Sequence, residues 1–226
     1  MEYRAAKNPE SFRQLATLLG EIAHHHSSVT LDTLTLNRWS DVMALMREVD
    51  DMADEEHLSR TDIMQRLESF DGLGERYPHL VPTGDNIPTH HRLYTTADTI
   101  LQTGEQLADT TTIDAYINHR TREAHATAQL FEDSASDSVR SQPELQQNFL
   151  PLLRALGEAA CFLDSAKDLA KDYQEGRTLL PPTLPHRTQL LRTSIHKLPE
   201  VLPLLPHLQI QRQLGRAAII HIARRF

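Results

Sequence analysis

Apolar residues recur at intervals of three and four along most of the chain, and no segment shows the strict alternation typical of a half-buried strand. Helices are therefore predicted over residues 9–25, 31–55, 59–70, 90–107, 112–132, 143–175 and 209–225. Pro9 suits the first turn of the first of these helices, and Gly176 suits the end of the sixth. The pattern predicts an all-α protein.

The connections between these helices are marked by glycine, proline and serine. Residues 71–88 combine glycine with proline, and residues 133–142 are polar and rich in serine, so both segments are predicted to be loops. Pro151 predicts a kink in the sixth helix, and the prolines of residues 181–206 are expected to interrupt the chain. No internal repeat divides the sequence, and we predict a single domain over residues 1–226.

Composition narrows the classes of function. Aromatic residues make up only 5% of the chain and glycine is sparse, which argues against an all-β fold. A net charge of −8 argues against nucleic acid as a partner, because phosphate backbones bind basic surfaces. Cys161 is the single cysteine, so no internal disulfide can form and a reducing compartment is favoured. Without a signal-peptide pattern or an apolar run of about 18 residues, we expect a cytoplasmic protein that is at most peripheral to a membrane.

Two groups of acidic residues carry the most information about function. They are Asp50, Asp51 and Asp54 near the end of the second predicted helix, and Asp164, Asp168 and Asp172 in the sixth. The second group is spaced four apart, which places its carboxylates along one side of a helix. Like charges in this arrangement destabilise an isolated helix by about 0.2–0.5 kcal/mol per pair, so a bound cation is the expected compensation. Taken alone, each group also fits a solvated helix surface.

Carboxylate oxygens are the ligands that Mg²⁺ prefers, and Mg²⁺ completes its shell with waters and substrate phosphates. If the two acidic helices face each other across a bundle, two or three Mg²⁺ ions would neutralise the converging carboxylates beside an apolar cavity. Such a site suits an apolar chain that carries a diphosphate. The metals stabilise the departing diphosphate, and a dry wall shelters the allylic carbocation from water.

Two motifs resemble those of the squalene/phytoene synthase family. The first motif consists of Arg47, two residues, Asp50-Asp51, two residues and Asp54. The second motif consists of Asp164, Asp168, Asp172, Gly176-Arg177 and Leu180-Pro181. Ser11-Phe12 resembles a further element near the start of family sequences, and the resemblance covers roughly residues 9–182. The order and separation of the motifs make the joint match more specific than either motif alone.

The resemblance implies an all-α, isoprenoid-synthase-type helical bundle around a central cavity. It also implies an enzyme, a prenyl-diphosphate-using transferase that binds Mg²⁺ and couples prenyl diphosphates with release of diphosphate. The implied metal ligands are Asp50, Asp51, Asp54, Asp164, Asp168 and Asp172, of which Asp50, Asp54, Asp168 and Asp172 are also assigned to catalysis. The residues assigned to the diphosphate are Arg47, Lys167 and Arg177.

Some positions depart from the family pattern and keep other functions open. The segment that corresponds to the family's central helix carries Arg122 and His125 but no glycine, which is expected to narrow the cavity, and fewer residues than usual follow Asp172. The first alternative is a class I terpene synthase, a lyase that acts on one prenyl diphosphate. Its diphosphate-sensing arginine would be Arg120 or Arg122, and we assign Arg122 to the diphosphate. The second alternative is a non-catalytic descendant that binds lipid or a partner protein.

Residues 208–226 combine arginine with isoleucine and leucine and are open to two interpretations. They either pack on the bundle, which is favoured, or contact a membrane surface. Three consecutive histidines at residues 24–26 point in different directions on a helix, so no metal site is expected there. Trp39 is expected in the core. The sequence also leaves the formation of a homo-oligomer open.

Overall fold

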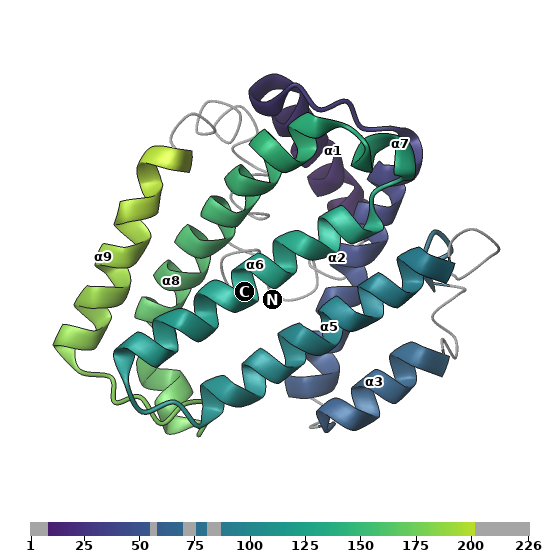
Figure 1. The fold of residues 1–226 in the computed structure, drawn as a ribbon. Helices are drawn as coiled ribbons and strands as arrows, with labels where there is room; N and C mark the ends of the chain where they lie inside the picture. Colours follow the sequence, from purple (N-terminus) through teal and green to yellow (C-terminus); the bar gives the residue numbers. More distant parts are fainter. Residues whose placement is uncertain (1–8, 55–57, 70–75, 81–86, 202–226) are drawn as a thin grey trace. The chain divides into compact units, whose positions relative to one another are not determined.

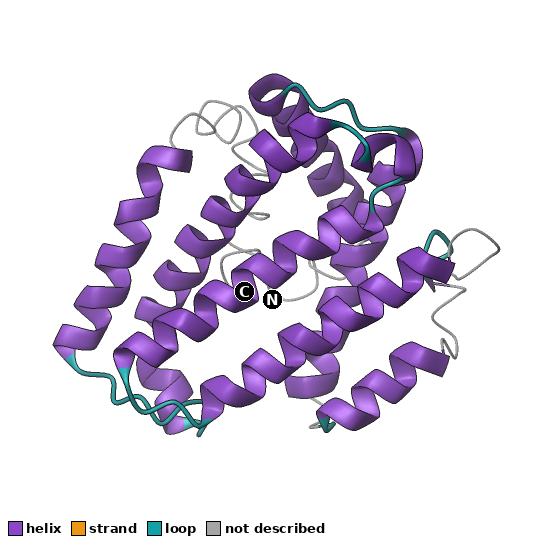
Figure 2. Ribbon diagram, viewed as in Figure 1, coloured by secondary structure: helices purple, strands orange, loops and turns teal. Residues whose placement is uncertain are grey.

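The computed structural model describes residues 9–54, 58–69, 76–80 and 87–201. Throughout these ranges the regular elements are helices, as Figure 1 and Figure 2 show. In chain order they are α1 (Pro9–Ser27), α2 (Thr33–Asp54), α3 (Arg60–Ser69), α5 (Ile87–Ala108), α6 (Ile113–Ser134), α7 (Asp137–Arg140), the π-helical turn η3 (Leu145–Phe149), α8 (Leu150–Gln174) and α9 (Leu184–Val201). The prediction of an all-α protein is confirmed for the described ranges. None of these helices is both long enough and apolar enough to cross a membrane.

The first six predicted helices are found, with slightly different ends. Just before Pro151, where a kink is predicted, the long helix contains the π-helical turn η3, which continues directly into α8; the kink itself stays a prediction. Proline has no N–H with which to close an ordinary helical turn, and a wider turn accommodates that loss. The predicted helix over residues 209–225 and most of the predicted loop over residues 71–88 lie outside the described residues.

Two segments differ from the sequence prediction. α7 forms inside the predicted loop over residues 133–142, because the Ser136 hydroxyl accepts a hydrogen bond from the Val139 N–H and caps the helix. α9 forms within the segment that the prolines are predicted to interrupt, so this prediction is wrong for residues 184–201, and residues 202–206 lie outside the described ranges. Pro185 lies in the first turn of α9, where no intrahelical N–H is needed, and Pro199 lies in the last turn.

The chain forms two compact units. The first unit consists of Met1–Asp98 and Gln129–Phe149, and the second unit consists of Thr99–Ala128 and Leu150–Phe226. α5 and α6 contribute residues to both units. The prediction of a single domain stays a prediction.

Trp39 forms the centre of the core in the first unit. Its ring stacks on that of Phe149, with centroids 5.6 Å apart and planes 8° apart, and meets the ring of Phe131 edge-on at 5.3 Å. Its Nε1 donates a hydrogen bond of 2.8 Å to the Phe131 carbonyl oxygen. The indole is fully buried, so this bond satisfies a donor that would be costly to leave unpaired. Trp39 therefore ties α2 to the end of α6 and to η3.

Asp32 joins the start of α2 to the start of α7. Its Oδ1 accepts a hydrogen bond of 2.7 Å from the Thr35 N–H, and its Oδ2 accepts bonds from the hydroxyls of Ser136 and Ser138 at 2.5 and 2.7 Å. Burial opposes the ionised form, but these hydrogen bonds outweigh it and lower the pKa of Asp32 to about 2. One carboxylate thus caps α2 and holds a segment about a hundred residues away.

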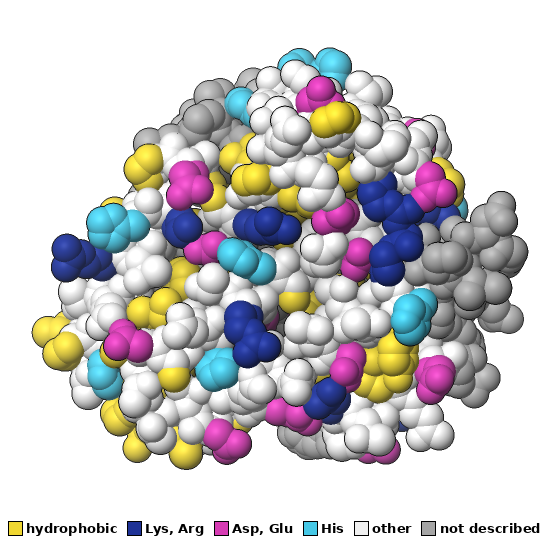
Figure 3. Space-filling model, in the orientation of Figure 1, with side chains coloured by type: hydrophobic (Ala, Val, Ile, Leu, Met, Phe, Trp, Pro, Cys, Tyr) yellow, Lys and Arg dark blue, Asp and Glu magenta, His cyan; other side chains and the backbone are white. Residues whose placement is uncertain are grey.

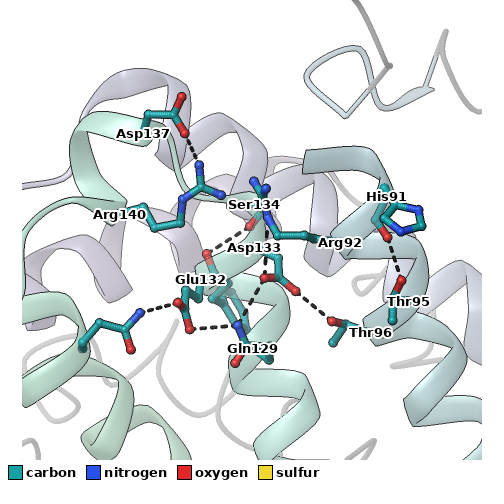
Figure 4. Close-up of polar contacts among 12 residues, drawn as sticks. His91, Arg92, Thr95, Thr96, Gln129, Glu132, Asp133, Ser134, Asp137 and Arg140 are labelled. Atoms are coloured by element: carbon teal, nitrogen blue, oxygen red, sulfur yellow. Dashed lines mark hydrogen bonds and ion pairs between the residues drawn. The ribbon is translucent and has the colours of Figure 1, made fainter. Parts of the chain in front are cut away.

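Asp133 links the end of α6 to α5 within the first unit (Figure 4). Its Oδ2 accepts a hydrogen bond of 2.7 Å from the Thr96 hydroxyl, and its Oδ1 accepts one of 3.2 Å from Gln129 Nε2. Arg92 Nε lies 3.9 Å from Asp133 Oδ1, which is an ion-pair distance rather than a hydrogen bond. Together these contacts compensate for burying a carboxylate.

α8 and α9 pack in opposite directions in the second unit. Arg187 Nε donates to the Ala166 carbonyl oxygen at 2.9 Å, and Ser194 Oγ donates to the Ala159 carbonyl oxygen at 2.8 Å. The core cluster of this unit consists of Leu107, Tyr116, Phe162, Ala166, Leu169, Leu180 and Leu190. This core fixes α8, the helix that carries the second acidic group.

Candidate functional site

The first acidic group lies at the end of α2, in the first unit. Arg47 is 7% exposed, and its Nη2 lies 2.5 Å from Asp51 Oδ1, one helical turn further on. Asp50 and Asp51 are both half-buried, whereas the side chain of Asp54 lies outside the described residues. The structure therefore brings Arg47 and Asp51 of the predicted site into direct contact.

Arg47 has hydrogen-bonding capacity that its described neighbours do not use. Its Nε and Nη1 are buried and have no hydrogen-bond partner among the described residues. Buried polar atoms are nearly always hydrogen-bonded, and each of these two N–H groups can donate a charge-assisted hydrogen bond to an anion. Arg47 is thus equipped to bind an anion.

Glu48 lies beside the first acidic group but has a different role. It accepts hydrogen bonds of 2.6 Å from the Tyr77 hydroxyl and 2.7 Å from Arg76 Nη1. Burial, followed by the hydrogen bond to Glu48, raises the pKa of Tyr77, so the phenol stays protonated and keeps donating. Glu48 therefore anchors residues 76–80 to α2. No local pattern predicts this pairing, which joins residues 29 positions apart.

The second acidic group lies on α8, in the second unit. Lys167 Nζ lies 3.0 Å from Asp168 Oδ1 and 3.9 Å from Asp164 Oδ1, and it approaches them from the solvent side. Burial, followed by the charge of Asp168, raises the pKa of Asp164 to about 6. Burial also raises the pKa of Asp172. Burial therefore disfavours the ionised forms of Asp164 and Asp172, and an added cation would favour those forms.

Arg120 on α6 is the cation that acts on this group from inside the unit. Its side chain is 18% exposed, and its Nη1 lies 2.8 Å from Glu123 Oε2. Its guanidinium also lies over the Tyr116 ring, 5.6 Å from the centroid. Burial opposes the charge of Arg120, but Glu123 and other neighbours outweigh it and raise its pKa. Its positive charge in turn lowers the pKa values of Asp164 and Asp172.

Arg122, the arginine assigned to the diphosphate from the sequence, lies elsewhere on α6. Its side chain is exposed, and its Nη1 donates a hydrogen bond of 3.3 Å to Gln106 Oε1. The sequence analysis offers Arg120 or Arg122 as the sensing arginine and assigns Arg122, whereas the charge of Arg120 is the one that lowers the pKa of Asp164. Two positions on a helix differ by about 200° in direction, which explains why the neighbours face different surroundings.

The Gly-Arg motif closes α8. Gly176 has a φ of +73°, a conformation that glycine adopts without strain. The N–H of Gly176 bonds to the Tyr173 carbonyl oxygen at 3.3 Å, and that of Arg177 bonds to the Asp172 carbonyl oxygen at 2.8 Å. Arg177 Nε lies 3.1 Å from Glu175 Oε2, and its charge lowers the pKa of Asp172. The motif thereby holds a cation next to the last residue of the acidic group.

A buried carboxylate that the sequence did not single out joins α6, α8 and α9. Glu158 is buried, with His125 Nε2 2.6 Å from its Oε1 and Lys197 Nζ 3.1 Å from its Oε2. The hydrogen bond to Glu158 raises the pKa of Lys197.

His125 and Arg122 are predicted from the sequence to narrow a cavity, but both side chains are exposed to solvent.

Within the described ranges, no three His, Cys, Asp or Glu side chains gather closely enough to hold a metal ion. The donors in both acidic groups are carboxylate oxygens, the ligand type that hard divalent cations take. The raised pKa values of Asp164 and Asp172 also fit a group that a cation would stabilise. The chemistry of the donors therefore suits Mg²⁺.

Comparison of the chain with protein-family models, with curated proteins and with solved structures finds no match. The resemblance to squalene/phytoene synthases therefore depends on the motif residues themselves.

Proposed function

We propose that the protein is a Mg²⁺-dependent isoprenoid synthase. In this proposal it ionises an allylic prenyl diphosphate and couples prenyl chains with release of diphosphate. The observation that carries the proposal is the row of Asp164, Asp168 and Asp172 along α8, whose first and last members are partly buried with raised pKa values beside Arg120. Partly buried acids with raised pKa values are typical of functional sites, and a bound cation would stabilise their ionised forms.

The proposed ligands of Mg²⁺ are the six aspartates of the two groups. They are Asp50, Asp51 and Asp54 on α2, and Asp164, Asp168 and Asp172 on α8. When bound, Mg²⁺ would neutralise the negative charge that develops on a departing diphosphate. The catalytic assignment of Asp50, Asp54, Asp168 and Asp172 follows from this role in metal binding.

The basic residues of the chain bind the diphosphate in this proposal. Arg47 offers two buried nitrogens that its described neighbours leave unused. Lys167 and Arg177 lie next to the second acidic group, where each can exchange a carboxylate for a phosphate oxygen. Arg120 keeps the charge of that group in balance before the substrate binds.

One observation favours the alternative of a class I terpene synthase that acts on a single prenyl diphosphate. Such enzymes use an arginine upstream of the second metal motif to sense the diphosphate, and Arg120 stands upstream of Asp164 and acts on it electrostatically. The two functions share the ionisation step and differ in which double bond attacks the carbocation: one of a second prenyl chain in coupling, or one of the same chain in a terpene synthase. The number of carbon atoms in the product separates them.

The test is an incubation with geranyl, farnesyl or geranylgeranyl diphosphate, with and without Mg²⁺. Diphosphate release shows ionisation, a product with twice the carbon number shows coupling, and an unchanged carbon number shows terpene-synthase chemistry. Asp168→Asn is expected to lower turnover at least about a hundredfold, whereas Asp109→Asn, at an exposed turn position, is the matched control. Absence of diphosphate release from all three substrates, or full activity of Asp168→Asn, would contradict the proposal.

A further inference from the structure

α9 carries a row of large apolar side chains at its surface. Leu184 is 79% exposed, Leu191 is 41% exposed and Ile195 is 59% exposed. Their spacing of seven and four residues places them on one side of the helix. In Figure 3, hydrophobic side chains reach the surface along the left edge, where Figure 1 places α9. We call these three residues the α9 row.

Packing of the second unit does not account for the α9 row. The side of α9 that faces α8 carries Leu190, which is fully buried, and Ser194, which bonds to the Ala159 carbonyl oxygen. With about 100° between successive residues, the α9 row lies roughly a quarter of a turn away from this buried side. The helix is therefore docked on the protein by one side and leaves a second apolar side to solvent.

Two exposed arginines flank the α9 row. On a helix with about 100° per residue, Arg187 lies roughly 60° to one side of Leu184, and Arg192 lies roughly 80° to the other. Lys197 pairs with Glu158 and Glu200, which leaves Arg187 and Arg192 as the cations of α9 without a described acidic partner; Arg187 uses its Nε on the Ala166 carbonyl oxygen. The whole chain, by contrast, has a net charge of −8. A basic helix on an acidic protein indicates an anionic partner.

We propose that α9 is an interfacial helix that binds an anionic lipid surface. The α9 row enters the boundary between the headgroups and the acyl chains, while Arg187 and Arg192 contact lipid phosphates on either side of it. Amphipathic helices with a basic polar side and a leucine-rich apolar side bind membranes in this orientation without crossing them. The proposal does not depend on the catalytic function.

The charges around the α9 row favour a lipid surface over a second copy of the chain. In a two-fold contact the same surface patch meets itself, so Arg187 and Arg192 of both copies would gather around one shared apolar centre. Such a contact gathers like charges around the apolar residues, whereas an anionic bilayer supplies opposite charges over the whole surface. The contact is also placed on α9 and not on residues 208–226, the membrane candidate of the sequence, which lie outside the described residues.

The experiment is co-sedimentation of the full-length protein with vesicles. One set of vesicles is phosphatidylcholine alone, and the other is a mixture of phosphatidylcholine and phosphatidylserine. The protein is expected to bind the mixed vesicles more strongly, and added salt is expected to weaken this binding because it screens the arginines. Arg192→Gln should reduce the preference for phosphatidylserine, since its side chain is exposed at the edge of the row.

The decisive variant replaces all three residues of the α9 row with serine. Because these side chains are exposed, the variant is expected to keep the circular dichroism spectrum of the wild type while its partition coefficient onto mixed vesicles falls about tenfold or more. Leu34→Ser is the matched control, because Leu34 is 43% exposed on α2 in the first unit. It should bind vesicles as the wild type does.

Three outcomes would overturn the proposal. The first is wild-type protein that binds neither kind of vesicle. The second is a folded triple variant that binds mixed vesicles as strongly as the wild type, which would assign binding to another surface. The third is a wild type that binds no vesicles but self-associates in analytical ultracentrifugation, together with a triple variant that stays monomeric. That last outcome would make the α9 row an interface between copies of the chain.

Discussion

Asp32→Ala tests the polar network that joins α2 to α7. In the folded protein the pKa of Asp32 falls from an ordinary 3.8 to about 2, and a pKa lowered by one corresponds to about 1.4 kcal/mol. The ionised carboxylate therefore contributes roughly 2.5 kcal/mol, which partial exposure reduces to about 2 kcal/mol. Loss of an aspartate cap alone costs about 0.5–2 kcal/mol, which agrees in size because the same hydrogen bonds are involved.

The sign of the pH dependence follows from the lowered pKa. The contribution of Asp32 is complete above the unfolded pKa of 3.8 and is lost as the pH falls through the folded pKa of about 2. The difference in unfolding free energy between wild type and Asp32→Ala should thus be about 2 kcal/mol at pH 6 and roughly half of that at pH 3. Asp32→Asn cannot ionise, so its stability should lack this component at every pH.

The measurement is urea denaturation followed by far-ultraviolet circular dichroism between pH 6 and pH 2.5. Asp109→Ala, at an exposed position between α5 and α6, should change stability by less than about 0.5 kcal/mol. A difference between wild type and Asp32→Ala that stays constant over the whole pH range would refute the reasoning. So would a difference below about 0.5 kcal/mol at pH 6, because it would mean that the three hydrogen bonds to the carboxylate contribute nothing net.

Three further predictions concern single side chains. Gly176→Ala should lower the free energy of unfolding by about 1 kcal/mol in urea denaturation, because its φ is +73° and no neighbouring atom would contact the added carbon; an unchanged value would show that the turn relaxes. Tyr77→Phe should cost about 1–2 kcal/mol in the same assay, since Glu48 loses a hydrogen bond of 2.6 Å. Arg120→Met should make the melting temperature rise with added Mg²⁺ more than in the wild type, because the acidic group loses its internal cation. Arg122→Met should behave as the wild type, and equal responses of the two variants would contradict the role assigned to Arg120.

The sequence predicts most helices because their apolar periodicity is strong. The prediction fails where the same residues suit either a helix or a loop, as proline and serine do at the start of a helix. Proline predicts an interruption after residue 181, yet α9 holds Pro185 in its first turn, where no intrahelical N–H is needed, and Pro199 in its last turn. Residues 133–142 are polar as a loop would be, but Ser136 caps α7 and its hydroxyl bonds to Asp32. The hydrogen bond between Ser136 and Asp32 joins residues about a hundred positions apart, so no local sequence pattern predicts it.

The candidate site shows the same limit. Spacing correctly places Asp164, Asp168 and Asp172 on α8, because side chains four residues apart share a helix side. Spacing alone favours neither Arg120 nor Arg122, and the assignment of Arg122 from the sequence does not include the electrostatic contact of Arg120 with Asp164, which depends on the rotation of α6 about its own axis. Glu48 lies next to the first acidic motif in the sequence, but it pairs with Tyr77. This is a tertiary contact, which the position of Glu48 in the motif does not predict.

The position of Trp39 gives the protein an internal optical reporter. It is the single tryptophan of the chain, and it is enclosed by Phe131 and Phe149, which both belong to the first unit. Its fluorescence spectrum therefore shifts to the red when water enters that unit, whatever happens in the second. Circular dichroism follows the helices of both units, so a fluorescence transition that occurs at a different urea concentration would show that the two halves of the chain unfold one after the other.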